Sequence, residues 1–292
     1  MLGPTASGKS EVALRFAEDI GAEIISVDSM QVYRRMDIGT AKAGPSDRAR
    51  VRHHGIDLVE PSDSFSVAEF QQVGRAVIET ASVPIVIVGG SGLHFRALVD
   101  PMHFRPHDTV VRAEVEQLTH EEGVTRLLSL DPGAADNIDL SNPRRVTRAL
   151  EDAALTGETP TSRASSAERR SVTAYEPLFA FKAVALDPGE GLKERVTQRL
   201  DSMVEDGLVD EVHALAVEMG RTARQAVGYK ELLPVVAGEI PLSEGVDAAR
   251  RATLALAKRQ RTYFRRDPRL KWLPWTNDID QLLRSASEAL RS

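Results

Sequence analysis

The chain has 292 residues and a formal net charge of −6 at pH 7, with 42% hydrophobic and 27% charged residues. These values are ordinary for a globular protein that buries a large core in one or two domains. The absence of Cys excludes disulfides and thiolate chemistry. The apolar runs are too short to span a bilayer and no signal peptide is visible, so we expect a cytoplasmic protein without membrane association.

A phosphate-binding pattern stands near the first residue. Residues 3–10 are GPTASGKS and match G-x-x-x-x-G-K-[ST] at each fixed position. Gly at both ends lets successive backbone N–H groups turn inward toward a polyphosphate, while Lys9 adds a positive charge and Ser10 a hydroxyl for Mg²⁺. Helical spacing of apolar residues predicts a helix over Ser10–Asp19 whose positive end faces the same phosphates. The alternative is a turn that only caps a helix.

The strand that normally leads into such a loop is not apparent. Only Met1 and Leu2 precede Gly3, whereas a phosphate loop usually follows a buried strand in the centre of a sheet. We therefore expect this strand to be missing, through a shortened N-terminus or a misassigned start codon. Its absence would lower stability and activity.

Strands and helices then alternate. Glu23–Val27 is a predicted strand that ends at Asp28, and Ser66–Ala81 is a predicted amphipathic helix with a capping box. Val83–Val88 is a predicted buried strand, closed by the glycines of Gly89–Gly92. This order predicts an α/β fold, a parallel sheet core of the P-loop NTPase-like kind. Ligands of such sheets lie beyond the carboxyl ends of the strands, where the loop, Asp28 and the glycines should meet.

The strand pattern stops in the middle of the chain. We assign 97–174 to a helical insertion and 1–96 plus 175–292 to the α/β core. Within the insertion we expect helices over Thr109–Glu122 and Asn142–Leu155 and a flexible polar stretch over Thr159–Ser171. Strand character returns at Phe179–Leu186. The helices expected after it are Gly191–Asp206, Val209–Met219 and Ser243–Arg265.

Asp28 is the second candidate for chemistry. In many phosphate-loop NTPases an Asp after a later strand holds Mg²⁺, but no carboxylate follows the strand that ends at Val88. Asp28 either replaces that Asp or serves as a general base, and the alternative is a turn or N-cap aspartate. Gln31, close behind, has the donor and acceptor geometry to bind an adenine edge.

Three further segments allow two interpretations each. Gly39–Lys42 is a ligand-facing turn that ends in a cation, or an ordinary loop with a surface Lys. Gly89–Gly92 permits close approach of a ligand, or is a tight strand-to-helix turn. In Gln225–Lys230, Tyr229 stacks on a base or packs in the core, and the residues alone favour packing.

Basic residues gather in two places despite the negative net charge. Residues 248–266 include seven basic residues and no acidic one, and a second cluster holds Arg144, Arg145 and Arg148. Each cluster is a solvated helix face or a contact to a phosphate backbone. Residues 258–265 also interleave cations with aromatics, which suits single-stranded nucleic acid, unless the aromatics are core residues of an amphipathic helix.

Together these segments resemble one family, the tRNA dimethylallyltransferases, also called tRNA isopentenyltransferases. The resemblance implies transfer of a dimethylallyl group from dimethylallyl diphosphate to N6 of the adenosine 3′-adjacent to the anticodon, in tRNAs that read codons beginning with U. Pyrophosphate leaves, so the loop would hold a diphosphate and not ATP. The segments that carry the resemblance are GPTASGKS (3–10), ISVDSMQVYRRMDIGTAK (25–42), IVIVGGSGLH (85–94), NPRRVTRALE (142–151), LVDEVHAL (208–215), QAVGYKE (225–231) and AKRQRTYFRR (257–266).

The resemblance also implies the roles of individual residues. Lys9 would stabilise the leaving pyrophosphate, Ser10 would bind Mg²⁺ or a phosphate oxygen, and Asp28 would accept the proton of the exocyclic amine. The diphosphate would be bound by Gly3, Pro4, Thr5, Ala6, Ser7, Gly8, Lys9 and Ser10. The tRNA anticodon stem-loop would be bound by Asp28, Ser29, Met30, Gln31, Ser91, Arg112, Arg144, Arg145, Arg148, Gln225, Gly228, Tyr229, Lys230, Lys258, Arg259, Gln260, Arg261 and Arg265.

The adenine would leave the anticodon-loop stack, the insertion would clasp the stem-loop, and the enzyme would work with Mg²⁺ as a monomer. Three positions depart from the family pattern: His94 where Tyr is common, Ala43 where Pro is usual, and Gln225 where some members carry an Arg that assists phosphate binding. From the loop alone, a small-molecule or nucleotide kinase remains an alternative. A nucleotide-dependent RNA-binding module without activity is the non-enzymatic alternative.

Overall fold

The computed structural model describes residues 1–105 and 108–291. The chain divides into two compact units, Met1–Leu98 with Ala180–Ser292, and Val99–Phe179. The second unit begins and ends a few residues after the predicted insertion of 97–174. Its two ends are tied together, because the N–H of Leu178 donates to the carbonyl of Val99 at 2.8 Å.

Parallel strands form the centre of the first unit. β1 (Glu23–Val27) pairs with β2 (His53–His54) on one side and with β3 (Ile85–Gly89) on the other. β4 (Ala183–Leu186) pairs in parallel with β5 (Leu270–Leu273). The inner strands β1 and β4 are almost entirely buried, as their continuous apolar sequences predict for a sheet covered on both faces.

Leu2 joins the two groups of strands at the entry to the phosphate loop. It bridges Gly89 in β3 and Ala185 in β4, in parallel with both. Its N–H donates to Val184 and its carbonyl accepts from Leu186, both at 2.9 Å. No strand of ordinary length precedes the loop, as expected, but Leu2 alone occupies the position between β3 and β4. Two residues are too few to show a strand pattern, yet here they make the central pairing.

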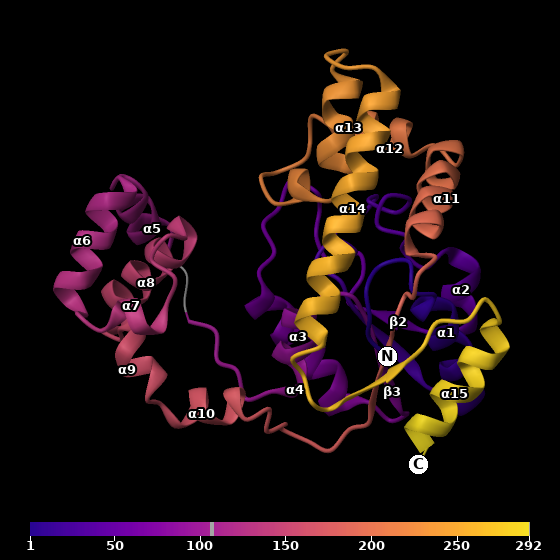
Figure 1. The fold of residues 1–292 in the computed structure, drawn as a ribbon, viewed down its shortest axis with the longest axis horizontal. Coiled ribbons are helices and arrows are strands. Elements are labelled where there is room, and N and C mark those ends of the chain that lie inside the picture. Colours follow the sequence, from indigo (N-terminus) through magenta and orange to yellow (C-terminus); the bar gives the residue numbers. More distant parts are fainter. Residues whose placement is uncertain (106–107, 292) are drawn as a thin grey trace. The chain divides into compact units, whose positions relative to one another are not determined.

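Helices cover this sheet and extend from one end of the first unit (Figure 1). α1 (Lys9–Ile20) packs against α15 (Ile279–Arg291) and β3 in the main apolar core. α3 (Val67–Thr80) has the predicted capping box. The other helices of this unit are α2 (Pro45–Arg50), α4 (Gly92–Val99), α11 (Leu192–Glu205), α12 (Leu208–Leu215), α13 (Tyr229–Val236) and α14 (Leu242–Phe264), with a short 3₁₀ turn at Ala223–Gln225.

The described residues of the second unit form helices and no strand. Two predictions were wrong here. The single helix over Thr109–Glu122 is broken, because Thr119 forms a capping box with Glu122 and starts a new helix. The flexible stretch over Thr159–Ser171 contains two short helices capped by Thr159 and Ser166. The helices are α5 (Thr109–Glu116), α6 (His120–Leu130), α7 (Ala134–Asn137), α8 (Pro143–Thr156), α9 (Pro160–Ala164) and α10 (Ala167–Thr173).

Among residues 1–105 and 108–291, no helix combines the length and the apolar character that crossing a bilayer requires.

Candidate active site

A cavity of about 360 Å³ lies in the first unit, beyond the carboxyl ends of β1 and β3. The structure brings together here the three sequence features expected to meet: the loop before α1, Asp28 after β1, and the glycines after β3. α11 and α14 supply part of the wall through Arg199, Leu256 and Gln260, and the turn of residues 39–43 supplies another part. The cavity therefore combines chain segments from both ends of the sequence.

The loop of residues 3–8 is curled in a way that needs its glycines. Gly3 has φ +147°, and a Cβ there would lie 2.8 Å from the carbonyl oxygen of Leu186. Gly8 has φ +75°, and a Cβ there would lie 2.8 Å from the Trp275 ring. The first bond of α1 runs from the N–H of Val12 to Gly8, so the N–H groups of the preceding turn have no partner within the helix. This is the geometry of an anion cradle.

Ser7 adds a second sign that the loop is built for a ligand. Its side chain is fully buried, and its hydroxyl has no hydrogen-bond partner in the described part of the chain. A buried hydroxyl without a partner costs free energy unless something binds it. An anion in the loop would provide an acceptor.

Two long side chains fix the loop from outside. The Nε of Arg195 donates to the carbonyl of Ala6 at 3.0 Å, and its guanidinium lies 4.0 Å above the centre of the Trp275 ring. On the other side, the N–H of Thr5 donates to Oε1 of Gln260 at 2.8 Å. These two hydrogen bonds hold the loop in its curled form.

The electrostatics of the cavity favour an anion. Burial, and after it the positive charge of nearby Arg199, lower the pKa of Lys9 to about 8, while Asp28 opposes the shift. Burial also lowers the pKa of Arg199, which donates to the hydroxyl of Thr5 at 3.4 Å. A bound anion would relieve the repulsion between the two cations and favour their charged forms.

Arg195 and Arg199 are site residues that the sequence analysis missed. They are four residues apart on α11, so they lie on one face of the helix. The sequence signal that could have indicated them is the pair of arginines four residues apart, on the first helix after a buried strand. It matches no motif, because the side chains reach a loop almost two hundred residues earlier.

Asp28 stands at the end of β1 and lines the cavity beside Lys9 and Ser10. Its Oδ1 accepts the N–H of Met30 at 2.8 Å, so one of its two carboxylate oxygens plays the part of a turn aspartate. Both interpretations of Asp28 are therefore compatible with the structure, since the same carboxylate shapes a turn and faces a ligand space.

Ser91 lies next to the end of β1, because its N–H donates to the carbonyl of Val27 at 3.0 Å. Its hydroxyl lies 2.7 Å from Nδ1 of His94, and the imidazole packs edge-on against Phe70. Burial lowers the pKa of His94, while Asp28 raises it. His94 is thus a buried partner of Ser91, and it lies close enough to Asp28 for that carboxylate to affect its pKa.

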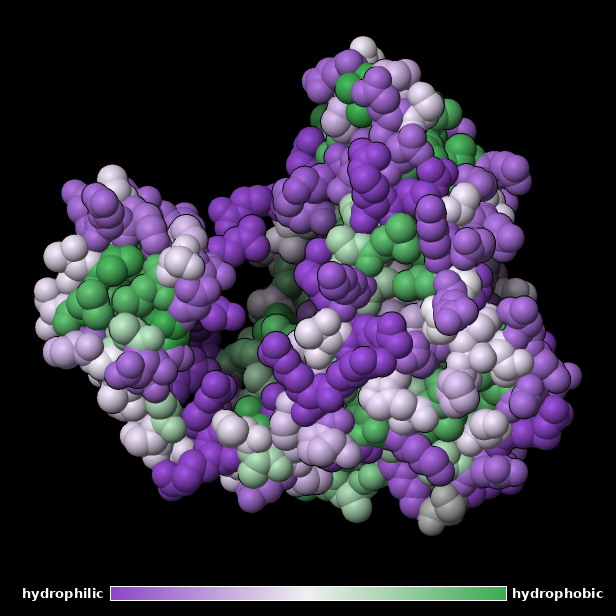
Figure 2. All heavy atoms as spheres, viewed as in Figure 1, coloured by the Kyte–Doolittle hydropathy of each residue, from purple (hydrophilic) through white to green (hydrophobic). Residues whose placement is uncertain are grey.

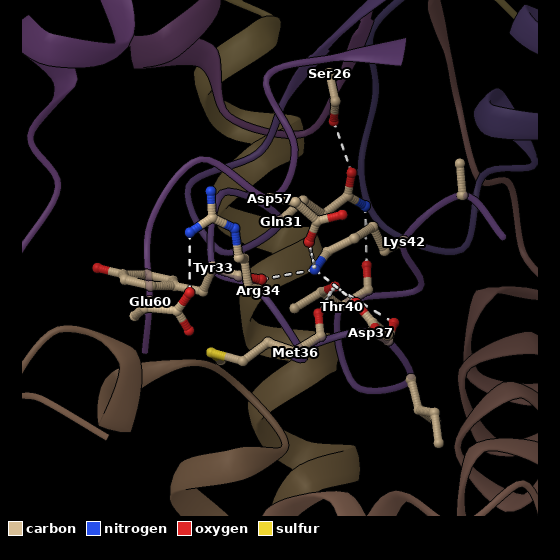
Figure 3. A network of polar contacts seen from close by, with 12 residues as sticks. Ser26, Gln31, Tyr33, Arg34, Met36, Asp37, Thr40, Lys42, Asp57 and Glu60 are labelled. Atoms are coloured by element: carbon tan, nitrogen blue, oxygen red, sulfur yellow. Dashed lines mark hydrogen bonds and ion pairs between the residues drawn. The ribbon is translucent and has the colours of Figure 1, made fainter. Parts of the chain in front are cut away.

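Gln31 is engaged by protein groups in this structure. Its Oε1 accepts from the hydroxyl of Ser26 at 2.7 Å, and its Nε2 donates to the carbonyl of Thr40 at 3.0 Å (Figure 3). The amide therefore holds the segment that ends in Lys42 against β1. Contact with an adenine would require exchange of these bonds.

Lys42 lies in the same network, and its side chain is fully buried. Its ammonium donates to the carbonyl of Tyr33 and to Asp37 at 2.6 Å, and to Asp57 at 2.8 Å (Figure 3). The interpretation of Lys42 as a surface residue was wrong. Its buried ammonium connects the acceptor groups of the turn through these three hydrogen bonds.

Tyr229 packs, as the residues alone favoured. It is fully buried, and its hydroxyl donates to the carboxylate of Glu211. That carboxylate also accepts three successive N–H groups, those of Asp37, Ile38 and Gly39, at 2.9, 2.9 and 3.1 Å. Of the neighbouring candidates, Gln225 and Lys230 are exposed, and Gly228 is the N-cap of α13 with φ +95°.

α14 combines the two interpretations offered for its basic sequence. Hydrophilic side chains make up much of its surface (Figure 2). Lys258 and Arg259 are exposed. Phe264 is buried, so one aromatic belongs to the core. Arg261 and Arg265 donate to Asp187 at 2.7 and 3.5 Å and keep much of their surface exposed.

The arginine candidates of the second unit differ from one another. Arg144 and Arg145 are exposed. Arg148 donates to the buried carboxylates of Glu151 and Asp152, each at 3.0 Å. Arg112 pairs with Glu116 at 2.7 Å and with Glu151 at 3.3 Å. Arg144, Arg145 and Arg148 also line a cavity of about 770 Å³ within this unit.

Fold and site define an α/β protein with a glycine-rich anion cradle at the carboxyl edge of a parallel sheet. Residues 31–267 match the IPP transferase family, and residues 1–55 match isopentenyl transferases. The chain belongs to the IPP transferase family.

Individual relatives agree over nearly the whole chain. The chain is 43% identical to the tRNA dimethylallyltransferase of Moorella thermoacetica over 300 residues, which covers 97% of this chain and 90% of that one. Among solved structures, the full-length tRNA isopentenylpyrophosphate transferase from Bacillus halodurans is 33% identical with a TM-score of 0.69, over 99% and 95% of the two chains. The transferase from Staphylococcus epidermidis is 30% identical with a TM-score of 0.70, over 99% and 97%.

Proposed function

We propose that this enzyme transfers a dimethylallyl group from dimethylallyl diphosphate to N6 of the adenosine 3′-adjacent to the anticodon, in tRNAs that read codons beginning with U. Family membership and relatives named tRNA dimethylallyltransferase support the reaction. The observation that carries it to this chain is one cavity that holds Lys9 and Ser10 of the loop together with Asp28.

The loop of residues 3–10 is the proposed site of the diphosphate, in a core of the P-loop NTPase-like kind. Its curled backbone and the first turn of α1 offer N–H groups, and Lys9 and Arg199 supply positive charge. Charge develops on the leaving pyrophosphate as its bond to carbon breaks. Donors already aimed at that place stabilise the transition state more than the ground state.

Asp28 is the proposed general base. The N6 nitrogen forms a bond to the first carbon of the dimethylallyl group, and the carbon–oxygen bond to the diphosphate breaks with its electron pair on oxygen. The proton displaced from the amine passes to the carboxylate of Asp28. The turn bond from Met30 at 2.8 Å holds this carboxylate in one orientation.

The residues present fit a Mg²⁺ ion that is carried mainly by the diphosphate. Ser10 stands on the first turn of α1 and lines the cavity beside Asp28. Mg²⁺ commonly takes one or two protein ligands and completes its shell with phosphate oxygens and water. We propose Ser10 as the residue that binds it, and the ion would neutralise charge on the diphosphate.

The anticodon stem-loop is the proposed partner, bound by the residues that the resemblance implies, apart from the buried Tyr229 and from Gln260. In the first unit the exposed cations Lys258 and Arg259 on α14 support an RNA contact. In the second unit Arg144 and Arg145 are exposed in the same way. The target adenine would leave its stack to reach Asp28. The enzyme is proposed to act as a monomer in the cytoplasm.

A labelling experiment tests the reaction. Radiolabelled dimethylallyl diphosphate should transfer label to an anticodon stem-loop RNA, in an amount matched by released pyrophosphate, without any ATP consumption. The same RNA with guanosine at the target position should remain unlabelled. A kinase would instead turn over labelled ATP, and an RNA-binding module would bind the RNA without product; either result contradicts the proposal.

A further inference from the structure

Gln260 is placed against the phosphate loop. Its Oε1 accepts the N–H of Thr5 at 2.8 Å. Its amide also lies against Gly90, since a Cβ on Gly90 would clash with Nε2 of Gln260 and lie 3.2 Å from its Cδ. The amide group is thus wedged between the loop and the turn after β3, inside the cavity.

The part of α14 that carries Gln260 is itself anchored. The next residue, Arg261, donates to Asp187 directly after β4 at 2.7 Å. One turn further on, the Tyr263 ring occupies the space where a Cβ on Gly92 would lie. Because the helix is fixed at these points, the position of the Gln260 amide is determined by the scaffold rather than by a ligand.

We propose that Gln260 is a positioning residue for the diphosphate rather than a contact to tRNA. Its carbonyl oxygen takes the N–H of Thr5, so the loop stays curled and the N–H groups that follow remain aimed at the diphosphate. The inference rests on the proposed function and assigns Gln260 to the leaving-group half of the same site.

A neutral amide suits this place for a physical reason. The loop has left-handed backbone conformations at Ala6, with φ +58°, and at Gly8, with φ +75°. This conformation strains Ala6, and Gly8 can leave it at little cost, so the loop would relax unless other residues hold it. A carboxylate at residue 260 would also accept from Thr5, but it would place negative charge beside a diphosphate. An apolar side chain would leave the N–H without a partner.

A single turn of α14 thus carries residues for both proposed binding sites, the RNA site and the diphosphate site. Lys258 and Arg259, the residues just before Gln260, are exposed and suited to RNA phosphates. Gln260 points into the cavity that contains the phosphate loop. Variants of neighbouring residues should therefore separate the two binding events.

The test uses the full chain with two probes, Mg²⁺-pyrophosphate measured by calorimetry and a fluorescent anticodon stem-loop RNA. Gln260→Leu should weaken pyrophosphate binding about tenfold, the order expected for one lost hydrogen bond, and leave RNA affinity within about twofold. Its kcat/KM for dimethylallyl diphosphate should fall in parallel, with the KM for RNA unchanged. The matched control on the same helix, Arg259→Leu, should show the opposite pattern.

Gln260→Glu keeps the acceptor for Thr5 and separates loop order from charge. Amide hydrogen exchange in residues 3–10 of the ligand-free protein should be faster in Gln260→Leu and near the wild-type rate in Gln260→Glu, while both variants bind pyrophosphate weakly. The inference is overturned if Gln260→Leu loses RNA affinity and keeps pyrophosphate affinity, or if its loop exchanges at the wild-type rate. If the unaltered chain bound neither probe, the proposed function itself would fail instead.

Discussion

Replacement of Lys42 by Met tests whether this buried cation stabilises the turn that borders the active site. The change removes an ammonium that donates to the carbonyl of Tyr33 and to the carboxylates of Asp37 and Asp57. Removal of one partner from a buried ion pair costs roughly 3–5 kcal/mol. Asp57 stays paired with Arg48 at 2.6 Å, and Asp37 is 56% exposed and returns to water. We therefore expect the lower end of the range, about 3 kcal/mol.

Urea unfolding followed by tryptophan fluorescence measures this cost. Trp272 and Trp275 are the two Trp residues of the chain, and both lie in the first unit, so their signal reports the unit that contains Lys42. Lys193→Met is the matched control, since Lys193 is exposed on α11 and should change the free energy of unfolding by less than about 0.5 kcal/mol. If Lys42→Met is as stable as this control but loses activity, Lys42 contacts substrate and the structural argument is refuted.

Three further changes have defined outcomes. Because the pKa of Lys9 is about 8, pyrophosphate affinity should fall as pH rises through 8, when the ammonium loses its proton. Calorimetry should find this decrease missing in Lys9→Met. Gly39→Ala places a Cβ in the space of the Tyr229 ring and should destabilise the first unit by about 1–3 kcal/mol in urea unfolding, and wild-type stability would contradict the packing. His94→Phe keeps an aromatic ring against Phe70 but removes the partner of the Ser91 hydroxyl. The kcat for prenyl transfer should therefore fall, while the thermal midpoint of unfolding changes by a few degrees at most. An unchanged kcat would show that the Ser91–His94 contact has no role in the reaction.

Periodicity and capping predicted most elements of the core from local sequence. β1 and α3 begin and end within about a residue of their predicted limits, because one is a continuous apolar run and the other carries a capping box. Convergence of the loop, Asp28 and Gly90 followed from a general property of parallel sheets. These features depend on neighbours in sequence or on topology alone.

Features that depend on contacts between distant residues could not be predicted. Leu2 becomes a central sheet residue only because β3 and β4 leave space between them. Arg195 donates to the carbonyl of Ala6, which lies 189 residues earlier in the chain. The burial of Lys42 depends on Asp37 and Asp57, which no local pattern joins to it. In each case tertiary contacts decide what the side chain does.

The central claim is that Asp28 accepts a proton from the target adenosine in a cavity that also holds the diphosphate. Asp28→Asn is the sharpest probe, because the amide oxygen can still accept the N–H of Met30 and the turn is kept. Single-turnover transfer of the dimethylallyl group to the stem-loop RNA should slow by roughly 10²–10⁴-fold, while affinities for pyrophosphate and RNA stay within about threefold. Transfer at the wild-type rate by Asp28→Asn would contradict the account.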